Sequence, residues 1–323
     1  MCINNKERMF FIKRYLILPA IALMVTLAGC SIAAGMATEQ TDVMQAATVP
    51  DTKVTTATLK TALSDFSGLP LLDALTIGKI PDPENSAGLS EETVEHSYGV
   101  ASDFKPHSIS VNFQDSFDKS GYRAICLDRV TKKKVVYLTF DCGWENGNTD
   151  KILDILKEKK VPSAFFCTLD HIETQPELIG RMIKDGHIVG NHSATHPDFS
   201  LISRTQMAEE LTKCTNYLRE NFGYNSTFFR FPKGNYSQSA LNLVDSLGYT
   251  SVFWSLSYGD WDTENTKGKD YAFQKVTSRM HPGAIILLHS VNPDNAEALA
   301  DIIDWTREQG YEFLPLTDLP TER

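Results

Sequence analysis

The chain has 323 residues, 42% of them hydrophobic, and a formal net charge of −10 at neutral pH. This negative balance argues against nucleic acid and other anionic polymers as partners, because like charges repel at long range. A neutral or zwitterionic substrate fits the charge better.

Residues 1–30 have the pattern of a bacterial export signal and are not expected to belong to the fold. Four basic residues precede an apolar stretch, residues 15–28, that is too short for a membrane span. Residues 27–30 read Leu-Ala-Gly-Cys and resemble a lipobox, in which the cysteine is acylated and becomes the new N-terminus. We therefore expect an extracytoplasmic protein, anchored to the outer face of the cytoplasmic membrane through Cys30; the alternative is an ordinary signal peptide cut nearby and a secreted protein.

Two segments of weak pattern follow the signal. Residues 31–61 are rich in Ala, Thr and Val without a helical or strand period, which is typical of a flexible tether. Residues 62–130 are rich in Pro and Gly and are expected to form an irregular lead-in that packs on the main domain. Removal of residues 1–30 takes away four basic residues and one acidic residue, so that the remainder carries 27 Lys and Arg against 40 Asp and Glu.

A regular alternation of short apolar runs and amphipathic segments begins near residue 131 and continues to residue 320. Each run is rich in β-branched or aromatic residues, as expected for parallel strands buried on both faces. One intervening segment places Met207, Leu211, Cys214 and Leu218 on one helical face. The alternation predicts one α/β domain. Its expected strands are 135–140, 163–167, 187–190, 227–231, 251–256, 284–289 and 311–316.

A closed barrel and an open doubly wound sheet share this alternation, and the positions of the polar candidate residues distinguish them. They fall at the C-terminal ends of five of the strands. In a closed barrel all such ends meet at one mouth, whereas an open sheet gathers only those near its switch point. The sequence therefore favours a barrel.

Asp141 and His289 each end an apolar strand, where a carboxylate base and an imidazole acid could act on one substrate. Each has a plainer interpretation. A strand-end Asp is often a turn former or helix cap, and a histidine beside leucines can be buried with its hydrogen bonds satisfied.

His192 and His196 follow a further strand end at a four-residue interval. In a helical turn two such imidazoles face the same way and can bind one cation, although two surface histidines would have the same spacing. Arg230 ends another strand before the turn Pro-Lys-Gly, where it could hold a carboxylate through two hydrogen bonds.

Together these segments resemble the polysaccharide deacetylase family, also called carbohydrate esterase family 4 or the NodB-homology domain. The resemblance rests on TFDCG at 139–143, HSATH at 192–196, RFPKG at 230–234 and LLH at 287–289, and covers about residues 130–320. Within the family, TFDCGWENGNT, WSLSYGDW at 254–261 and HPGAIILLH followed by NAEAL are most similar to the branch that makes muramic δ-lactam in spore peptidoglycan.

The resemblance implies a distorted (β/α)7 barrel that removes acetyl from an N-acetylated amino sugar. By motif position, Asp141 would be the general base and His289 the general acid. His192 and His196 would bind a divalent cation, expected to be Zn2+, and Arg230 would orient Asp141. The implied partner is the glycan of peptidoglycan.

The chain departs from the family pattern at three positions. Cys142 stands where many members have an Asp that binds the metal, and it is either a third ligand or a packed thiol. Phe231 replaces a proline, a change expected to be mild. Ser257 stands where other branches have an Asp that supports the catalytic histidine, so that either Asp260 takes this role or His289 has no carboxylate partner.

Other residues receive plainer interpretations. Cys167 and Cys214 are expected to be small buried hydrophobes, and the five histidines outside the motifs, including His171, to be structural. Four aromatic residues in the strand-end loops suit either a sugar face or ordinary packing: Trp144, Tyr236, Tyr258 and Trp261.

These observations leave three functions in competition. The first is metal-dependent de-N-acetylation of N-acetylmuramic acid in peptidoglycan, and the second is the same reaction on N-acetylglucosamine in peptidoglycan or a chitin-like polymer. The third is a non-catalytic wall-binding lipoprotein, with Cys142 and Ser257 as traces of lost activity. A glycosidase is disfavoured because it needs two opposed carboxylates, and only Asp141 is well placed.

Overall fold

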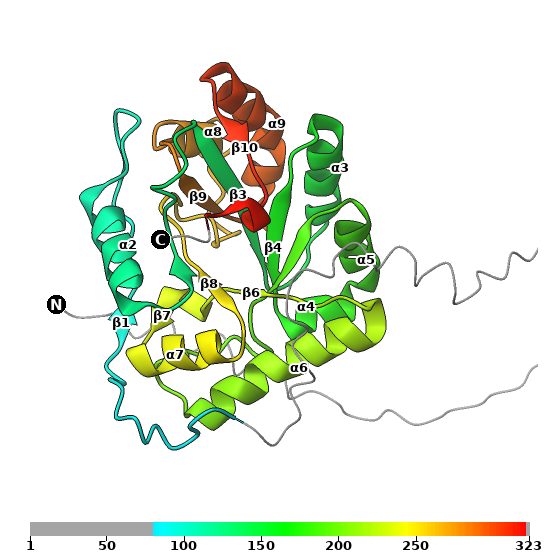
Figure 1. Cartoon of the computed structure of the whole chain (residues 1–323). Helices are drawn as coiled ribbons and strands as arrows, with labels where there is room; N and C mark the ends of the chain where they lie inside the picture. The colour runs from blue at the N-terminus through cyan, green and yellow to red at the C-terminus, as the bar shows by residue number, and fades with distance from the viewer. Residues whose placement is uncertain (1–79, 321–323) are drawn as a thin grey trace, which may run out of the picture. The chain divides into compact units, whose positions relative to one another are not determined.

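A curled parallel sheet surrounded by helices forms the centre of the protein (Figure 1). The computed structural model describes residues 80–320, so the predicted signal, the tether and the first part of the lead-in lie outside the described residues. Within residues 80–320 no helix is both long and apolar enough to cross a membrane.

The strands of the main sheet are short and buried. Hydrogen bonds join them in the order β10-β3-β4-β5-β6-β8-β2, and β9 also pairs with β3. Every pairing in this sheet is parallel. The strands are β2 (Ala124–Ile125), β3 (Val135–Cys142), β4 (Ser163–Cys167), β5 (Ile188–Asn191), β6 (Phe228–Phe229), β8 (Thr250–Val252), β9 (Ala284–His289) and β10 (Glu312–Phe313).

Helices alternate with these strands and cover the outside of the sheet (Figure 1). Pro176 stands in the first turn of its helix, and Gly223 caps the end of another in the left-handed conformation. The helices are α2 (Ser108–Ser120), α3 (Thr149–Lys159), α4 (Leu169–Thr174), α5 (Pro176–Lys184), α6 (Arg204–Phe222), α7 (Gln238–Ser246), α8 (Lys269–Thr277) and α9 (Pro293–Glu308).

The chain after β8 closes the sheet toward β9. The backbone N–H groups of Ser255 and Leu256 donate to the carbonyl of Ile285, and Leu256 forms a parallel bridge with Ile286. The predicted strand 251–256 is therefore shorter than expected, because its second half leaves β2 and pairs with β9. This change of partner confirms the distorted barrel that the sequence favours.

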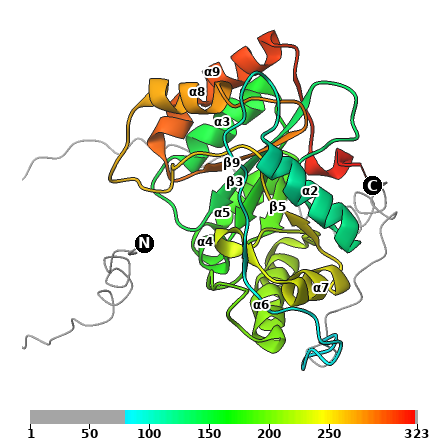
Figure 2. The ribbon, with the colours of Figure 1, turned by 90° about the vertical axis from the view of Figure 1, so that its left-hand side faces the viewer.

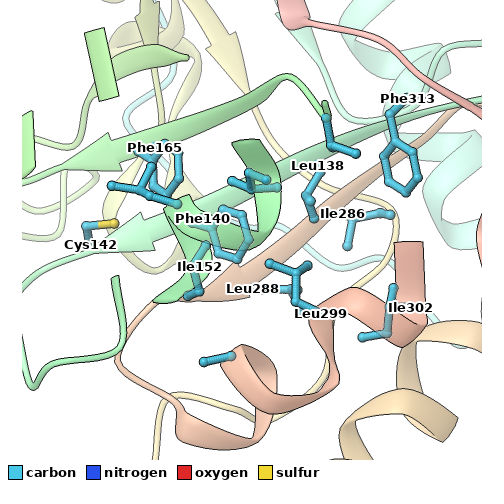
Figure 3. Close-up of a cluster of buried hydrophobic side chains, with 14 of the residues drawn as sticks. Leu138, Phe140, Cys142, Ile152, Phe165, Ile286, Leu288, Leu299, Ile302 and Phe313 are labelled. Atoms are coloured by element: carbon cyan, nitrogen blue, oxygen red, sulfur yellow. The ribbon is translucent and has the colours of Figure 1, made fainter. Parts of the chain in front are cut away.

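Alternation along β3 sorts its side chains onto two faces. Leu138, Phe140 and Cys142 belong to the hydrophobic cluster beneath α3 and α9, which also contains Phe165 and Leu299 (Figure 3). Because neighbouring residues of a strand point to opposite faces, Asp141 points away from this cluster. The face that Asp141 occupies is the inside of the barrel.

The lead-in is more regular than the sequence predicts. It contains α2, which packs outside the sheet (Figure 2), and β2, which extends the sheet beside β8. The buried side chain of Gln114 accepts hydrogen bonds from the backbone N–H groups of Cys126 and Leu127 and thereby fixes α2 to β2. The prediction missed both elements because two of the three buried residues of α2, Ser110 and Gln114, are polar and β2 has only two residues. A separate two-stranded pairing joins Val94–Glu95 (β1) to Asn235–Tyr236 (β7).

Gly283, just before β9, has no room for a side chain. Its φ is +75°, and a Cβ there would lie 1.8 Å from the carbonyl oxygen of Asp128. We expect Gly283→Ala to lower the free energy of unfolding by at least about 2 kcal/mol, because the backbone must shift as well as accept a left-handed φ. Urea denaturation measures the change.

Gly310→Ala is the matched control, since Gly310 has a φ of +82° but open space around a Cβ. It should cost only about 1 kcal/mol, the penalty of the left-handed conformation alone. Equal losses in the two variants would contradict the close approach at Gly283.

Candidate active site

The pairing of β3 with β9 places Asp141 directly beside His289 at the C-terminal ends of the two strands. Asp141 is 7% exposed, and the structure confirms its expected position at the barrel mouth. Asp141 and His289 are far apart in the sequence, but the pairing register of β3 and β9 brings them together.

Arg230 is fully buried and holds Asp141 in place. Its NH1 nitrogen lies 2.7 Å from the Asp141 Oδ1, its Nε donates to the carbonyl of Val252 at 2.9 Å, and its guanidinium lies over the Phe166 ring. The predicted contact with a carboxylate is present, but through one nitrogen: Nε bonds to the neighbouring strand, and NH2 has no partner among the described residues.

His192 lies on the other side of Asp141. Its Nδ1 is 2.9 Å from the carbonyl oxygen of Arg230, and its Nε2 is 3.5 Å from the Asp141 Oδ2. Because a backbone carbonyl only accepts, Nδ1 carries the proton and Nε2 keeps its lone pair toward the site.

His196 lies next to His192, with the two ring centroids 4.9 Å apart. The expected helical turn is absent at this point: residues 192–196 form a loop, and Ser193 and His196 have φ values of +70° and +58°. The two imidazoles are neighbours because of this loop, so the four-residue spacing found the pair for an incorrect structural reason.

Buried polar groups fix the unusual loop. The Asn191 side chain accepts from the N–H of Ser193, and the Ser193 hydroxyl accepts from the N–H of His196. Thr195 donates both its N–H and its hydroxyl to the buried carboxylate of Glu210 in α6. Glu210 could not be predicted from the sequence, because no motif links it to the loop.

Asp260 is the carboxylate partner of His289, which settles one of the alternatives left open by the sequence. Its Oδ1 lies 2.7 Å from the His289 Nδ1, and its Oδ2 accepts from the His289 backbone N–H. Asn295 of α9 donates to the same carboxylate. Ser257, which stands where other branches have the supporting Asp, instead donates to the carbonyl of Leu287.

Neighbouring charges shift the pKa values of the two candidate acid–base groups in opposite directions. Burial alone would raise the pKa of Asp141, but Arg230, His192 and His289 outweigh it and hold the pKa below its usual value. Burial alone would lower the pKa of His289, but Asp260 outweighs it and raises the pKa. Asp141 is therefore ionised at neutral pH, and the protonated form of His289 is stabilised relative to that of a free imidazole.

The histidine pair fits a divalent cation chemically. Desolvation lowers the pKa of His192 and of His196, so both imidazoles are neutral, the form that binds a metal. The Nε2 of His192 faces the mouth with its other nitrogen already fixed, as is usual for a ligating histidine. The Asp141 carboxylate beside it supplies negative charge.

Cys142 does not join this pair. It is fully buried among the hydrophobic side chains on the outer face of β3, beside Phe165 (Figure 3). Among the described residues, its Sγ forms a group of close donor atoms with Cys167 and His171, and not with the two site histidines.

The four aromatic candidates divide into two kinds. Trp144 and Trp261 are 49% and 67% exposed, and the Trp261 ring lies 6.4 Å from that of His289. Tyr236 and Tyr258 are buried: Tyr236 packs in the core, and the Tyr258 hydroxyl bonds to Asn295. Only the tryptophans are available to a ligand.

Comparison with known proteins agrees with this geometry. Residues 128–252 match the model of the family described as polysaccharide deacetylase. The peptidoglycan-N-acetylmuramic acid deacetylase PdaA of Bacillus subtilis is 44% identical over 194 residues, which cover 60% of this chain and 74% of that protein. The chain belongs to the polysaccharide deacetylase family.

Solved structures of family members share the fold. The structure of Bacillus subtilis PdaA, a family 4 carbohydrate esterase, has a TM-score of 0.68 and 39% identity, and the match covers 72% of this chain and 98% of that one. A family 4 carbohydrate esterase from Bacillus anthracis has a TM-score of 0.58 and 42% identity over 72% of this chain and 97% of its own. The matched family and the relative PdaA are named for deacetylation, the hydrolysis of an amide, so the prediction of an enzyme of this class is confirmed.

We expect Asp260→Asn to move the alkaline limb of the kcat/KM profile to lower pH. The substitution removes the negative charge that raises the pKa of His289, so the imidazole loses its proton at a lower pH. At neutral pH kcat/KM should fall at least about tenfold. A pH series of initial rates measures both effects.

Asp294→Asn is the control for this change. Asp294 is a buried carboxylate of the same helix region, but it accepts from the backbone N–H groups of Lys267 and Gly268 and not from His289. Its variant should keep the wild-type alkaline limb. An alkaline limb of Asp260→Asn at the wild-type pH would show that Asp260 does not control the protonation of His289.

Proposed function

We propose that the protein removes the acetyl group from N-acetylmuramic acid residues of peptidoglycan, with the help of a divalent cation. The observation that supports this most is the meeting of an ionised Asp141, a proton-bearing His289 and the pair His192 and His196 at one barrel mouth. The muramic specificity rests on the similarity to a relative named for that activity.

In this proposal the reaction is amide hydrolysis by acid–base catalysis. Asp141, fixed by Arg230, accepts a proton from the water that adds to the acetyl carbonyl. His289 donates the proton on its Nε2 to the sugar nitrogen as the C–N bond breaks, because its Nδ1 is bound to Asp260. The products are acetate and the free amine of the sugar, the group that δ-lactam formation requires.

His192 and His196 would hold the cation, which we expect to be Zn2+. When bound, it supplies Lewis acidity toward the amide carbonyl and lowers the pKa of water. Arg230 also contributes here, because its backbone carbonyl holds His192 in the tautomer that leaves Nε2 free.

Two residues, Ser257 and Cys142, suggested a non-catalytic protein, and neither removes the acid–base pair. Ser257 suggested a decayed site, but Asp260 supplies the carboxylate for His289 from three residues further along. Cys142, the other suspected trace, lies on the outer face of β3 and leaves the acid–base pair intact.

We further propose that the protein works outside the cytoplasmic membrane, where peptidoglycan lies. Relatives named for peptidoglycan deacetylation support this location. Residues 1–30 would direct export, Cys30 would carry the lipid anchor, and residues 31–61 would tether the domain to the membrane. The deacetylase domain would then span about residues 131–320, extended by β2 and α2 from the preceding segment.

Mass spectrometry of peptide-free glycan strands after incubation with the Zn2+-loaded protein tests this function. We expect loss of acetyl on muramic residues, and a parallel release of acetate that a chelator abolishes. Loss confined to glucosamine residues would instead assign the second candidate substrate, and no loss from either sugar would refute catalysis.

Asp141→Asn is the matched control, because it keeps the shape of the side chain and both histidines while it removes the base. Turnover should fall at least about a hundredfold with bound metal retained. Substantial activity in this variant would show that another group accepts the proton.

A further inference from the structure

A second cluster of metal-binding side chains lies on the opposite face of β3 from the active site. Cys142 at the end of β3, Cys167 at the end of β4 and His171 in α4 have donor atoms that all lie within 4.8 Å of one another. Cys142 and Cys167 are direct neighbours in the pairing of β3 with β4. All three residues are fully buried.

Within this group, His171 is the residue whose polar atoms lack partners. Both of its ring nitrogens are buried and have no hydrogen-bond partner within the described part of the chain. A buried polar group without a partner is destabilising, and most buried polar groups in folded proteins are satisfied. The imidazole borders two sulfur atoms, which are poor hydrogen-bond acceptors but strong ligands of soft metals.

The spacing and charge of the group suit Zn2+. With Zn–S bonds of about 2.3 Å and Zn–N bonds of about 2.1 Å, ligand atoms around one tetrahedral ion lie about 3.5–3.8 Å apart, which is compatible with the observed limit of 4.8 Å. Two thiolates cancel the double charge of the ion, so the assembly is neutral and suits the apolar cluster around it. The Ser290 hydroxyl, 3.2 Å from the Cys142 Sγ, is a neighbouring oxygen.

We propose that Cys142, Cys167 and His171 bind one Zn2+ ion at a structural site distinct from the catalytic histidine pair. The ion would join the ends of β3 and β4 to the start of α4. Because Asp141 precedes Cys142 on β3, this site would stiffen the strand end that carries the base. The proposal does not depend on the substrate or on catalysis by the active site.

A disulfide between Cys142 and Cys167 is the competing use of the two thiols. It would need their oxidation and would leave both nitrogens of His171 without a partner. Zn2+ uses all three side chains and requires only that the two thiols release their protons to solvent.

Cobalt(II) titration of the whole reduced protein distinguishes this site from the active site. Co2+ bound by thiolates gives an intense sulfur-to-metal charge-transfer absorption, whereas the candidate catalytic ligands, His192 and His196, are imidazoles without sulfur. We expect this band in the wild-type protein and its loss on addition of Zn2+, with two equivalents of Zn2+ bound in total.

The variants Cys142→Ser and Cys167→Ser should lose the band and one equivalent of Zn2+. His171→Leu keeps both thiols and should weaken binding about ten- to a hundredfold. Cys214→Ser is the matched control, since Cys214 is also a buried cysteine near Cys167 but does not belong to the group of close donor atoms. It should keep both the band and the stoichiometry.

Several results would overturn the proposal. They are the absence of the charge-transfer band in reduced wild-type protein, a band that persists in Cys142→Ser, and a Cys142–Cys167 disulfide that forms in air and is unaffected by prior addition of Zn2+. Circular dichroism verifies that each variant is folded. If the cysteine variants do not fold, His171→Leu and the wild-type band still decide the outcome.

Discussion

The buried ion pair between Arg230 and Asp141 is the contact on which the site depends. One residue makes three connections: its guanidinium holds the base, its Nε bonds to Val252 of the next strand, and its backbone carbonyl fixes His192. A guanidinium that is 0% exposed is stable only when its charge is compensated. Asp141 must therefore be ionised for the barrel to close around Arg230, and the requirement of the fold coincides with the requirement of a general base.

The two faces of β3 explain how one strand serves both the core and the site. Residues that alternate toward the helices are apolar, while Asp141 alone carries charge into the barrel from the strand end. The apolar run and its terminal acid were visible in the sequence, because they are continuous there, but the division of the run into two faces was not predicted. The strand-end positions of Asp141, Arg230 and His289 could be predicted for the same reason, and the barrel followed from them.

Features that depend on contacts between distant segments could not be predicted. The loop of His192 and His196 takes its shape from left-handed residues and from Glu210, which lies on a separate helix. The support of His289 by Asp260 was one of two open alternatives, since only the folded loop brings the carboxylate to Nδ1. The side to which Cys142 points was equally open, because the residue stands where β3 ends and strand alternation need not continue. Helix α2 escaped detection because two of its three buried residues are polar.

The dependence of the site on Arg230 is tested most directly by the pH profile of kcat/KM for Arg230→Lys, in protein shown to be folded by circular dichroism. Lysine keeps the charge but cannot bond to Asp141 and Val252 together. We expect kcat/KM to fall at least about tenfold and the acid limb to move to higher pH, because the hydrogen bond from the guanidinium, which lowers the pKa of Asp141, is lost. A folded variant with the wild-type kcat/KM and an unchanged acid limb would contradict the central role of this ion pair.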